Sequence, residues 1–156
     1  MSEEKLAYED FRPGHTFPLG PKQVTAEEII EFATEFDPQP MHLDEEAGRR
    51  SVLGGLAASG WHTCAMLMRM MADSYLLAAH SEGAPGIDFA EWRKPVLAGD
   101  ALSGVSVVLE ARPMRSRPRI GIVKFRHELK NQRGEIVCAA ENSVMLKMRT
   151  QPETAA

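Results

Sequence analysis

FATEFDPQPMHLD, residues 32–44, combines the end of a helix, a rigid loop and two titratable side chains. Pro38 and Pro40 fix their own φ angles and restrict the residues before them, so the helix is predicted to stop at Asp37. Asp37 and His42 are therefore held close in sequence with little freedom, as general acid/base catalysis requires. The spacing alone equally fits an aspartate that caps a turn and a histidine that bonds the backbone.

Helices are predicted on both sides of this loop. Thr25 and Glu28 form a capping-box pattern at the start of the preceding helix. Asp44 is a candidate cap for a short following helix, and Ser59 for a long one from about 60 to 79. That long segment is apolar on most of its circumference, which indicates a helix buried by surrounding structure.

The second half of the chain changes to the alternating pattern of strands. The strands are expected at 86–97, 101–111, 123–129 and 136–148, with residues 10–24 irregular apart from one short strand. Helices followed by an antiparallel meander of about four strands predict an α+β domain, whose sheet curls around the long helix. We expect a single domain over residues 1–156, with an ordered core of about 8–149.

Composition excludes several classes of protein. The chain has 156 residues, which suits one domain, and a net charge of −4, which gives no general attraction to nucleic acid or anionic membranes. Residues 1–5 are polar and acidic, unlike a secretory signal. The apolar stretch 61–79 is interrupted by Arg69 and Asp73, which we expect to pair, so no membrane span is predicted. Cys64 and Cys138 form neither a metal cluster nor a disulfide framework and suit a reducing, cytoplasmic compartment.

The start of the long helix is a second candidate for chemistry. Free backbone N–H groups at Ser59 and Gly60, together with the helix dipole, could stabilise an oxyanion that grows on a thioester carbonyl. Taken alone, the same feature is an ordinary capped helix.

Three motifs together carry a specific resemblance. The run 32–44, the sequence Ala58-Ser59-Gly60 and the run 92–100 with Pro95-Val96 and Gly99-Asp100 resemble, in order and spacing, the MaoC-like, (R)-specific enoyl-CoA hydratase family. The resemblance implies a hot-dog fold and a homodimer or higher homo-oligomer. It also implies that Asp37 and His42 are the catalytic pair and that the N–H of Gly60 is the oxyanion donor.

The implied reaction is reversible syn hydration of a trans-2-enoyl-CoA to a (3R)-3-hydroxyacyl-CoA, or of the corresponding acyl carrier protein thioester. No metal and no cofactor are implied, since coenzyme A is part of the substrate. No nucleic acid or membrane partner is expected. His42 with Asp44 offers too few ligands for a metal site.

The candidates for substrate binding fall into two groups. Gln39, Ser59 and Trp61 depart from the family's common pattern, with Gln39 in place of Asn and Ser59 in place of His. His62 follows them on the helix, where the alternative is a structural histidine near Arg69 and Asp73. Arginines that could meet the phosphates of coenzyme A are Arg93, Arg115 and Arg117. The alternative for Arg115 and Arg117 is a solvated hairpin loop.

Two rival functions remain. A hot-dog thioesterase typically carries a carboxylate on or near the central helix, but the first turn here has no acid and Asp73 lies far along the helix. A non-catalytic acyl-thioester binding protein is the other alternative, against which the intact Asp37 and His42 argue.

Overall fold

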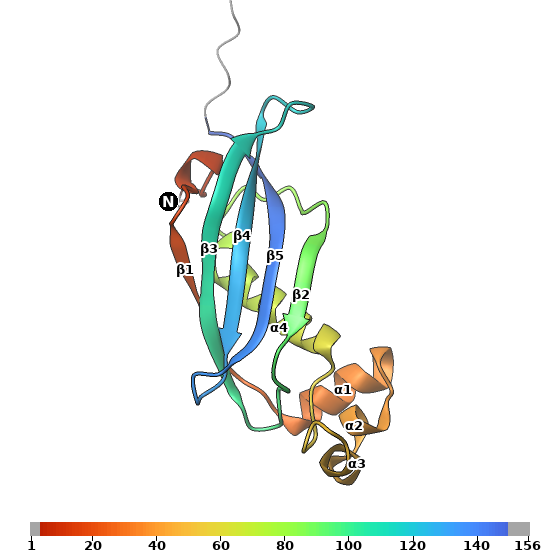
Figure 1. Cartoon of the computed structure of the whole chain (residues 1–156). Helices are drawn as coiled ribbons and strands as arrows, with labels where there is room; N and C mark the ends of the chain where they lie inside the picture. Colours follow the sequence, from red (N-terminus) through yellow and green to blue (C-terminus); the bar gives the residue numbers. More distant parts are fainter. Residues whose placement is uncertain (1–3, 150–156) are drawn as a thin grey trace, which may run out of the picture.

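A computed structural model describes residues 4–149 of the chain (Figure 1). The expected absence of a secretory signal concerns residues 1–5, of which the first three lie outside the described part. The helical elements lie mainly in the first half of the chain. They are η1 (Tyr8–Asp10), α1 (Ala26–Phe36), α2 (Pro40–Leu43), α3 (Glu45–Arg50), α4 (Gly60–Met71) and the π-helical turn η2 (Ala72–Leu76).

The local signals at the helix starts are confirmed. Thr25 Oγ1 accepts from the N–H of Glu28 at 3.2 Å, and Glu28 reaches back to the N–H of Thr25 at 3.3 Å, which forms the capping box of α1. Asp44 accepts from the N–H of Ala47 at 2.9 Å and caps α3. These caps fix where each short helix begins and so where the intervening loop lies.

Five antiparallel strands form one sheet. They are β1 (Thr16–Gln23), β2 (Ile87–Trp92), β3 (Ala101–Pro113), β4 (Ile120–Lys130) and β5 (Ile136–Lys147), in the spatial order β1-β3-β4-β5-β2. The sheet curls around α4, while α1, α2 and α3 cluster at one end of it (Figure 1). The chain is thus an α+β domain with the hot-dog fold, as predicted.

Two details of the predicted sheet were wrong. Only β3, β4 and β5 form a meander, because β2 pairs with β5 at one edge and not with its neighbour in sequence. Residues 16–23 form a full fifth strand despite Pro18 and Pro21. They pair only with β3, and an edge strand tolerates prolines because one side of its backbone needs no donors.

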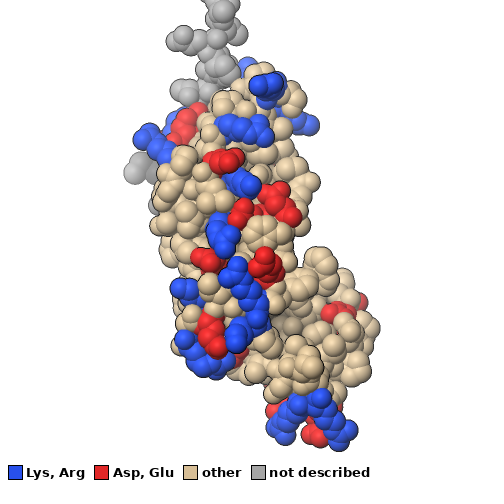
Figure 2. Space-filling model, in the orientation of Figure 1, with Lys and Arg blue, Asp and Glu red and all other residues tan. Residues whose placement is uncertain are grey.

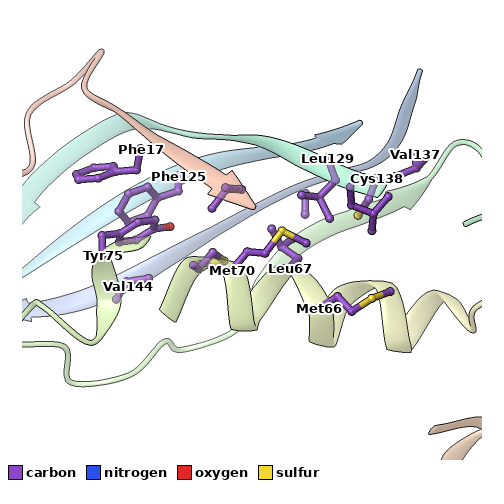
Figure 3. Close-up of a cluster of buried hydrophobic side chains, with 14 of the residues drawn as sticks. Phe17, Met66, Leu67, Met70, Tyr75, Phe125, Leu129, Val137, Cys138 and Val144 are labelled. Carbon is purple, nitrogen blue, oxygen red and sulfur yellow. The ribbon is translucent and has the colours of Figure 1, made fainter. Parts of the chain in front are cut away.

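The core lies between α4 and the inner face of the sheet (Figure 3). Val123, Phe125 and Leu129 point inward from β4 and are fully buried, as the alternating pattern predicted. Leu67 and Met70 face them from α4. Fully burying one side chain of this size contributes about 1.5–3 kcal/mol, so this layer holds the start of α4 in a fixed place.

The long helix is shorter than predicted. Regular α-helix ends at Met71, and the π-helical turn η2 continues to Leu76. Arg69 Nε lies 3.1 Å from Asp73 Oδ2, so the predicted pair forms. Across residues 4–149, no helix combines the length and the apolar character needed to cross a membrane.

The outer face of the sheet carries charge of both signs (Figure 2). Arg126 lies 2.8 Å from Glu141 and 3.8 Å from Glu128, and Lys124 lies 3.8 Å from Glu141. Lys124, Arg126 and Glu128 alternate along β4 with the buried residues, so one face of the sheet meets water and the other packs against the core.

Candidate active site

Asp37 occupies the C-cap of α1, where Pro38 ends the helix. Two side-chain donors hold its carboxylate. Ser59 Oγ donates to Oδ2 at 2.6 Å, and Gln39 Nε2 donates to Oδ1 at 2.7 Å. The hydrogen bond from Ser59, followed by that from Gln39, lowers the pKa of Asp37 below its usual value. Asp37 is therefore an ionised carboxylate in a fixed orientation.

His42 lies in the single turn of α2, which begins at Pro40. Its side chain is buried, with 6% of the residue exposed. Nδ1 lies 2.7 Å from the carbonyl oxygen of Ala57, which can only accept, so Nδ1 carries the hydrogen. In neutral His42 the acceptor is then Nε2, and it lies 3.5 Å from Asp37 Oδ2. Two acceptor atoms thus face each other at the end of α1.

The segment 57–59 joins this pair to the rest of the fold. The N–H of Ala57 donates to the carbonyl of Met41 at 3.3 Å, and the N–H of Ala58 donates to the carbonyl of Val96 at 2.8 Å. Ser59, which follows directly, is fully buried. One short extended segment therefore orients His42 through a carbonyl and Asp37 through a hydroxyl.

Gly60 begins α4, and among residues 4–149 no group accepts a hydrogen bond from its N–H. The indole of Trp92 lies directly against it, because a Cβ at residue 60 would come within 2.5 Å of the ring. A free N–H at the positive end of a helix is a suitable donor for an oxyanion. Glycine is needed here because of the close approach of Trp92.

A cavity of about 410 Å³ opens between these elements. His42 and Gly60 line it, together with Thr63 from α4 and Trp92 from β2. Arg93 also lines it, as predicted for a substrate-binding arginine, and Lys94 lies beside it. Asp37 is not among the described lining residues, and its Oδ2 lies 3.5 Å from Nε2 of the lining residue His42.

The structure places the other predicted residues elsewhere. Gln39 and Ser59 engage Asp37, and Ser59 makes no side-chain cap for α4, contrary to expectation. Trp61 is 66% exposed and meets Trp92 edge-on at 5.5 Å. His62 stacks on Phe32 of α1 at 4.7 Å instead of lying near Arg69 and Asp73.

Arg115 and Arg117 lie in the β3–β4 hairpin, at the end of the sheet opposite α1, α2 and α3 (Figure 1). The described chain therefore does not bring them to the cavity that Arg93 lines. Sequence reasoning missed Trp92 and Ala57 as site residues. Their roles depend on approaches from distant parts of the chain, and no local pattern signals them.

Comparisons with known proteins identify the family of this chain. Residues 10–130 match the family model described as a MaoC like domain. The MaoC-like dehydratase from Rhodospirillum rubrum is 42% identical, with a TM-score of 0.80, over 93% of this chain and 99% of that chain. YdeM from Bacillus subtilis (strain 168) is 30% identical over 91% of this chain and 99% of its own length.

The R-hydratase PhaJ1 from Pseudomonas aeruginosa shares the fold, with a TM-score of 0.74 at 18% identity over 97% of both chains. With the family match spanning most of the sequence, the chain belongs to the MaoC-like dehydratase family.

Proposed function

We propose that the protein is an acyl-CoA hydratase and dehydratase that adds water reversibly to a trans-2-enoyl thioester. The observation that carries the proposal is the 3.5 Å separation of Asp37 Oδ2 and His42 Nε2 beside the free N–H of Gly60. Two acceptors at this distance can each take one hydrogen of the same water molecule. They would orient the water's oxygen toward a substrate in the cavity.

The proposed reaction uses this arrangement in both directions. The water oxygen forms a bond to C3 of the enoyl chain as the Asp37–His42 pair takes its proton. The electron pair of the double bond moves onto the thioester oxygen, where the N–H of Gly60 stabilises the enolate. The pair then returns the proton to C2 on the same face, which gives syn addition and leaves the enzyme unchanged.

The low pKa of Asp37 has a consequence for this mechanism. An ionised carboxylate that already accepts from Ser59 and Gln39 is a weak base by itself. His42 therefore takes the proton, and Asp37 stabilises the imidazolium that forms. Coenzyme A enters only as part of the substrate, and the residues named here account for the proton transfers without any further group.

Positive charge at the mouth of the cavity favours a coenzyme A thioester. Arg93 and Lys94 line the cavity and are exposed, so their side chains can meet phosphates in solution. Arg93 pairs with Glu91 at 3.1 Å and Lys94 with Glu135 at 3.7 Å, and such surface pairs are weak enough to exchange for a phosphate. An acyl carrier protein thioester presents its acyl chain on the same phosphopantetheine arm and is the alternative substrate.

A homodimer is also proposed, from the free edge of the sheet. Strand β2 pairs only with β5, so its outer edge presents unpaired backbone groups. Ile87 and Trp92 on this strand, and Met68 on the adjacent face of α4, are apolar and exposed. Pairing of β2 with β2 of a second copy would cover all of them.

The free thiols Cys64 and Cys138 suit the reducing cytoplasm.

A thioesterase is less well supported by the site. The first turn of α4 has no acidic residue, and Asp73 is exposed and paired with Arg69. Neither offers a carboxylate beside Gly60 that could activate water at the thioester carbonyl.

The test is hydration of crotonyl-CoA and longer enoyl-CoA substrates, followed as loss of enoyl thioester absorbance. We expect turnover by the wild type and a loss of about a hundredfold or more in Asp37→Asn and in His42→Ala. Ser51→Ala is a control, since Ser51 bonds only backbone groups. Full turnover by both active-site variants, or thiol release from saturated acyl-CoA without hydration, would overturn the proposal.

A further inference from the structure

A second cavity lies farther along the boundary between α4 and β2, which we call the α4–β2 seam. It measures about 310 Å³ and is lined by Leu67, Met68 and Met71 of α4 and by Ile87 of β2. Within residues 4–149, no Lys, Arg, Asp or Glu side chain lines it. Methionine side chains adapt to irregular apolar ligands, so the walls suit a hydrocarbon chain.

The polar lining of this cavity belongs to an ordered chain of hydrogen bonds. Tyr75 donates to Ser106 Oγ at 3.0 Å, and Ser106 Oγ lies 2.7 Å from His127 Nδ1. Ser106 is fully buried, so its own hydrogen goes to Nδ1. His127 therefore carries its hydrogen on Nε2 and donates it to Asn142 Oδ1 at 2.7 Å.

This series of hydrogen bonds leaves one donor without a partner among the described residues, Nδ2 of Asn142. With Oδ1 of Asn142 occupied by His127, the amide's Nδ2 is fixed on the other side. Among residues 4–149 nothing accepts from it, although Asn142 is only 8% exposed and lines the cavity. An apolar cavity whose lining includes one donor that no described residue accepts from is complementary to an apolar ligand that carries an uncharged acceptor.

The second cavity lies in line with the first. Trp92 lines the cavity that contains Gly60, and its Nε1 lies 3.4 Å from Sγ of Cys64, which lines the second cavity. Across the sheet, Trp92 pairs with Cys138 and Ile87 with Asn142. Along β5, four residue steps separate Cys138 from Asn142, which is about 13 Å, or roughly ten bonds of an extended acyl chain.

We infer that the seam holds the acyl chain of the substrate, and that this chain carries a hydroxyl or oxo oxygen that accepts from Asn142 Nδ2. The inference rests on the proposed hydratase function, since it takes the thioester to lie at Gly60. It narrows the substrate class to medium-chain acyl thioesters oxygenated about ten to twelve bonds from the thioester. The N–H···S contact joins a residue of the first cavity, Trp92, to a residue of the second, Cys64, so the acyl chain would run beside this contact.

Binding of saturated acyl-CoA tests the inference separately from turnover, because a saturated chain cannot be hydrated. The ligands are decanoyl- and dodecanoyl-CoA, both thioesters with a hydroxyl on carbon 8 or 10, and dodecanoyl-CoA with a hydroxyl on carbon 12. Each is titrated calorimetrically into the full-length wild type. One hydroxyl position is expected to bind about tenfold tighter than the unsubstituted chain. Weaker or equal binding at every position overturns the inference, whatever the outcome with crotonyl-CoA.

Asn142→Asp is the matched variant. It retains an acceptor for His127 Nε2 and the size of the side chain, but it has no N–H to donate. We expect the tenfold preference for the hydroxylated chain to disappear or reverse. A preference that survives in a folded Asn142→Asp variant would overturn the role of Asn142. If this variant does not fold, the wild-type series alone decides.

Discussion

Replacement of Ser59 by alanine should destabilise the fold in a way that depends on pH. Ser59 is fully buried, and its hydroxyl donates at 2.6 Å to the ionised carboxylate of Asp37. A hydrogen bond to a charged group contributes about 1.5–3 kcal/mol, so Ser59→Ala should lower the free energy of unfolding by that amount near neutral pH. The control Ser51→Ala removes a hydroxyl that bonds neutral backbone groups and should cost about 0.5–1.5 kcal/mol.

The sign of the pH dependence follows from the pKa of Asp37. Ser59, followed by Gln39, lowers that pKa in the folded protein below 3.8. A carboxyl with a lowered folded pKa stabilises the fold above its unfolded pKa and loses that contribution as pH falls through the folded value. The cost of Ser59→Ala should therefore be constant near neutral pH. It should shrink toward that of a neutral hydrogen bond below pH 3.8.

Urea unfolding of the wild type, Ser59→Ala and Ser51→Ala at a series of pH values measures these differences. An Asp37→Asn background completes a double-mutant cycle, in which the cost of Ser59→Ala should fall because the charge is gone. A cost equal to that of Ser51→Ala at every pH would refute a bond from Ser59 to an ionised Asp37. None of these measurements depends on the proposed activity.

Three further changes test other contacts. Gly60→Ala should lower kcat/KM for crotonyl-CoA by roughly tenfold or more, because the new Cβ meets the Trp92 ring at 2.5 Å. A second substitution, Trp92→Leu, should restore part of the lost activity. Tyr75→Phe should cost about 1 kcal/mol in urea unfolding through the lost bond to Ser106. Arg93→Ala should raise KM for a CoA thioester several-fold at low salt, and less as ionic strength rises, if Arg93 meets phosphates. A KM for Arg93→Ala that does not change with salt would count against that role.

The parts of the fold that could be predicted depend on local signals. The capping box of α1, the cap of α3 and the stop at Pro38 involve residues only a few positions apart, so the sequence shows both partners. Alternation along β4 likewise reports which face is buried. Strand β1 was largely missed because Pro18 and Gly20 are typical of turns, and only its position at the sheet edge makes them acceptable.

The contacts that define the site are mostly non-local and could not be read in the same way. Ser59 reaches Asp37 across 22 positions, and Ala57 orients His42 across 15. The rigid loop predicted Asp37 and His42 as a pair and the helix start predicted Gly60 separately, and only the family's motif related the three to one another. What it did not show is the direction of the Ser59 hydroxyl, which points to the carboxylate and not to a substrate or to the start of α4.

That direction changes what the departures from the family pattern mean. Gln39 and Ser59 both donate to Asp37, so these two departures act on the acid strength and orientation of the carboxylate. Trp61 is exposed and is not among the lining residues described for either cavity. None of the three is among the described residues that line either cavity.

In the proposed arrangement, selectivity belongs to the α4–β2 seam, whose walls come from the later turns of α4, from β2 and from the inner face of the sheet. The acid/base pair lies on α1 and α2, whereas the walls of the seam come from α4, β2 and the sheet. Substitutions along the seam can therefore change the acyl chain that is accepted without moving the carboxylate or the imidazole. In the proposed function, therefore, Asp37 and His42 carry the chemistry, and residues such as Met68, Met71 and Asn142 select the substrate.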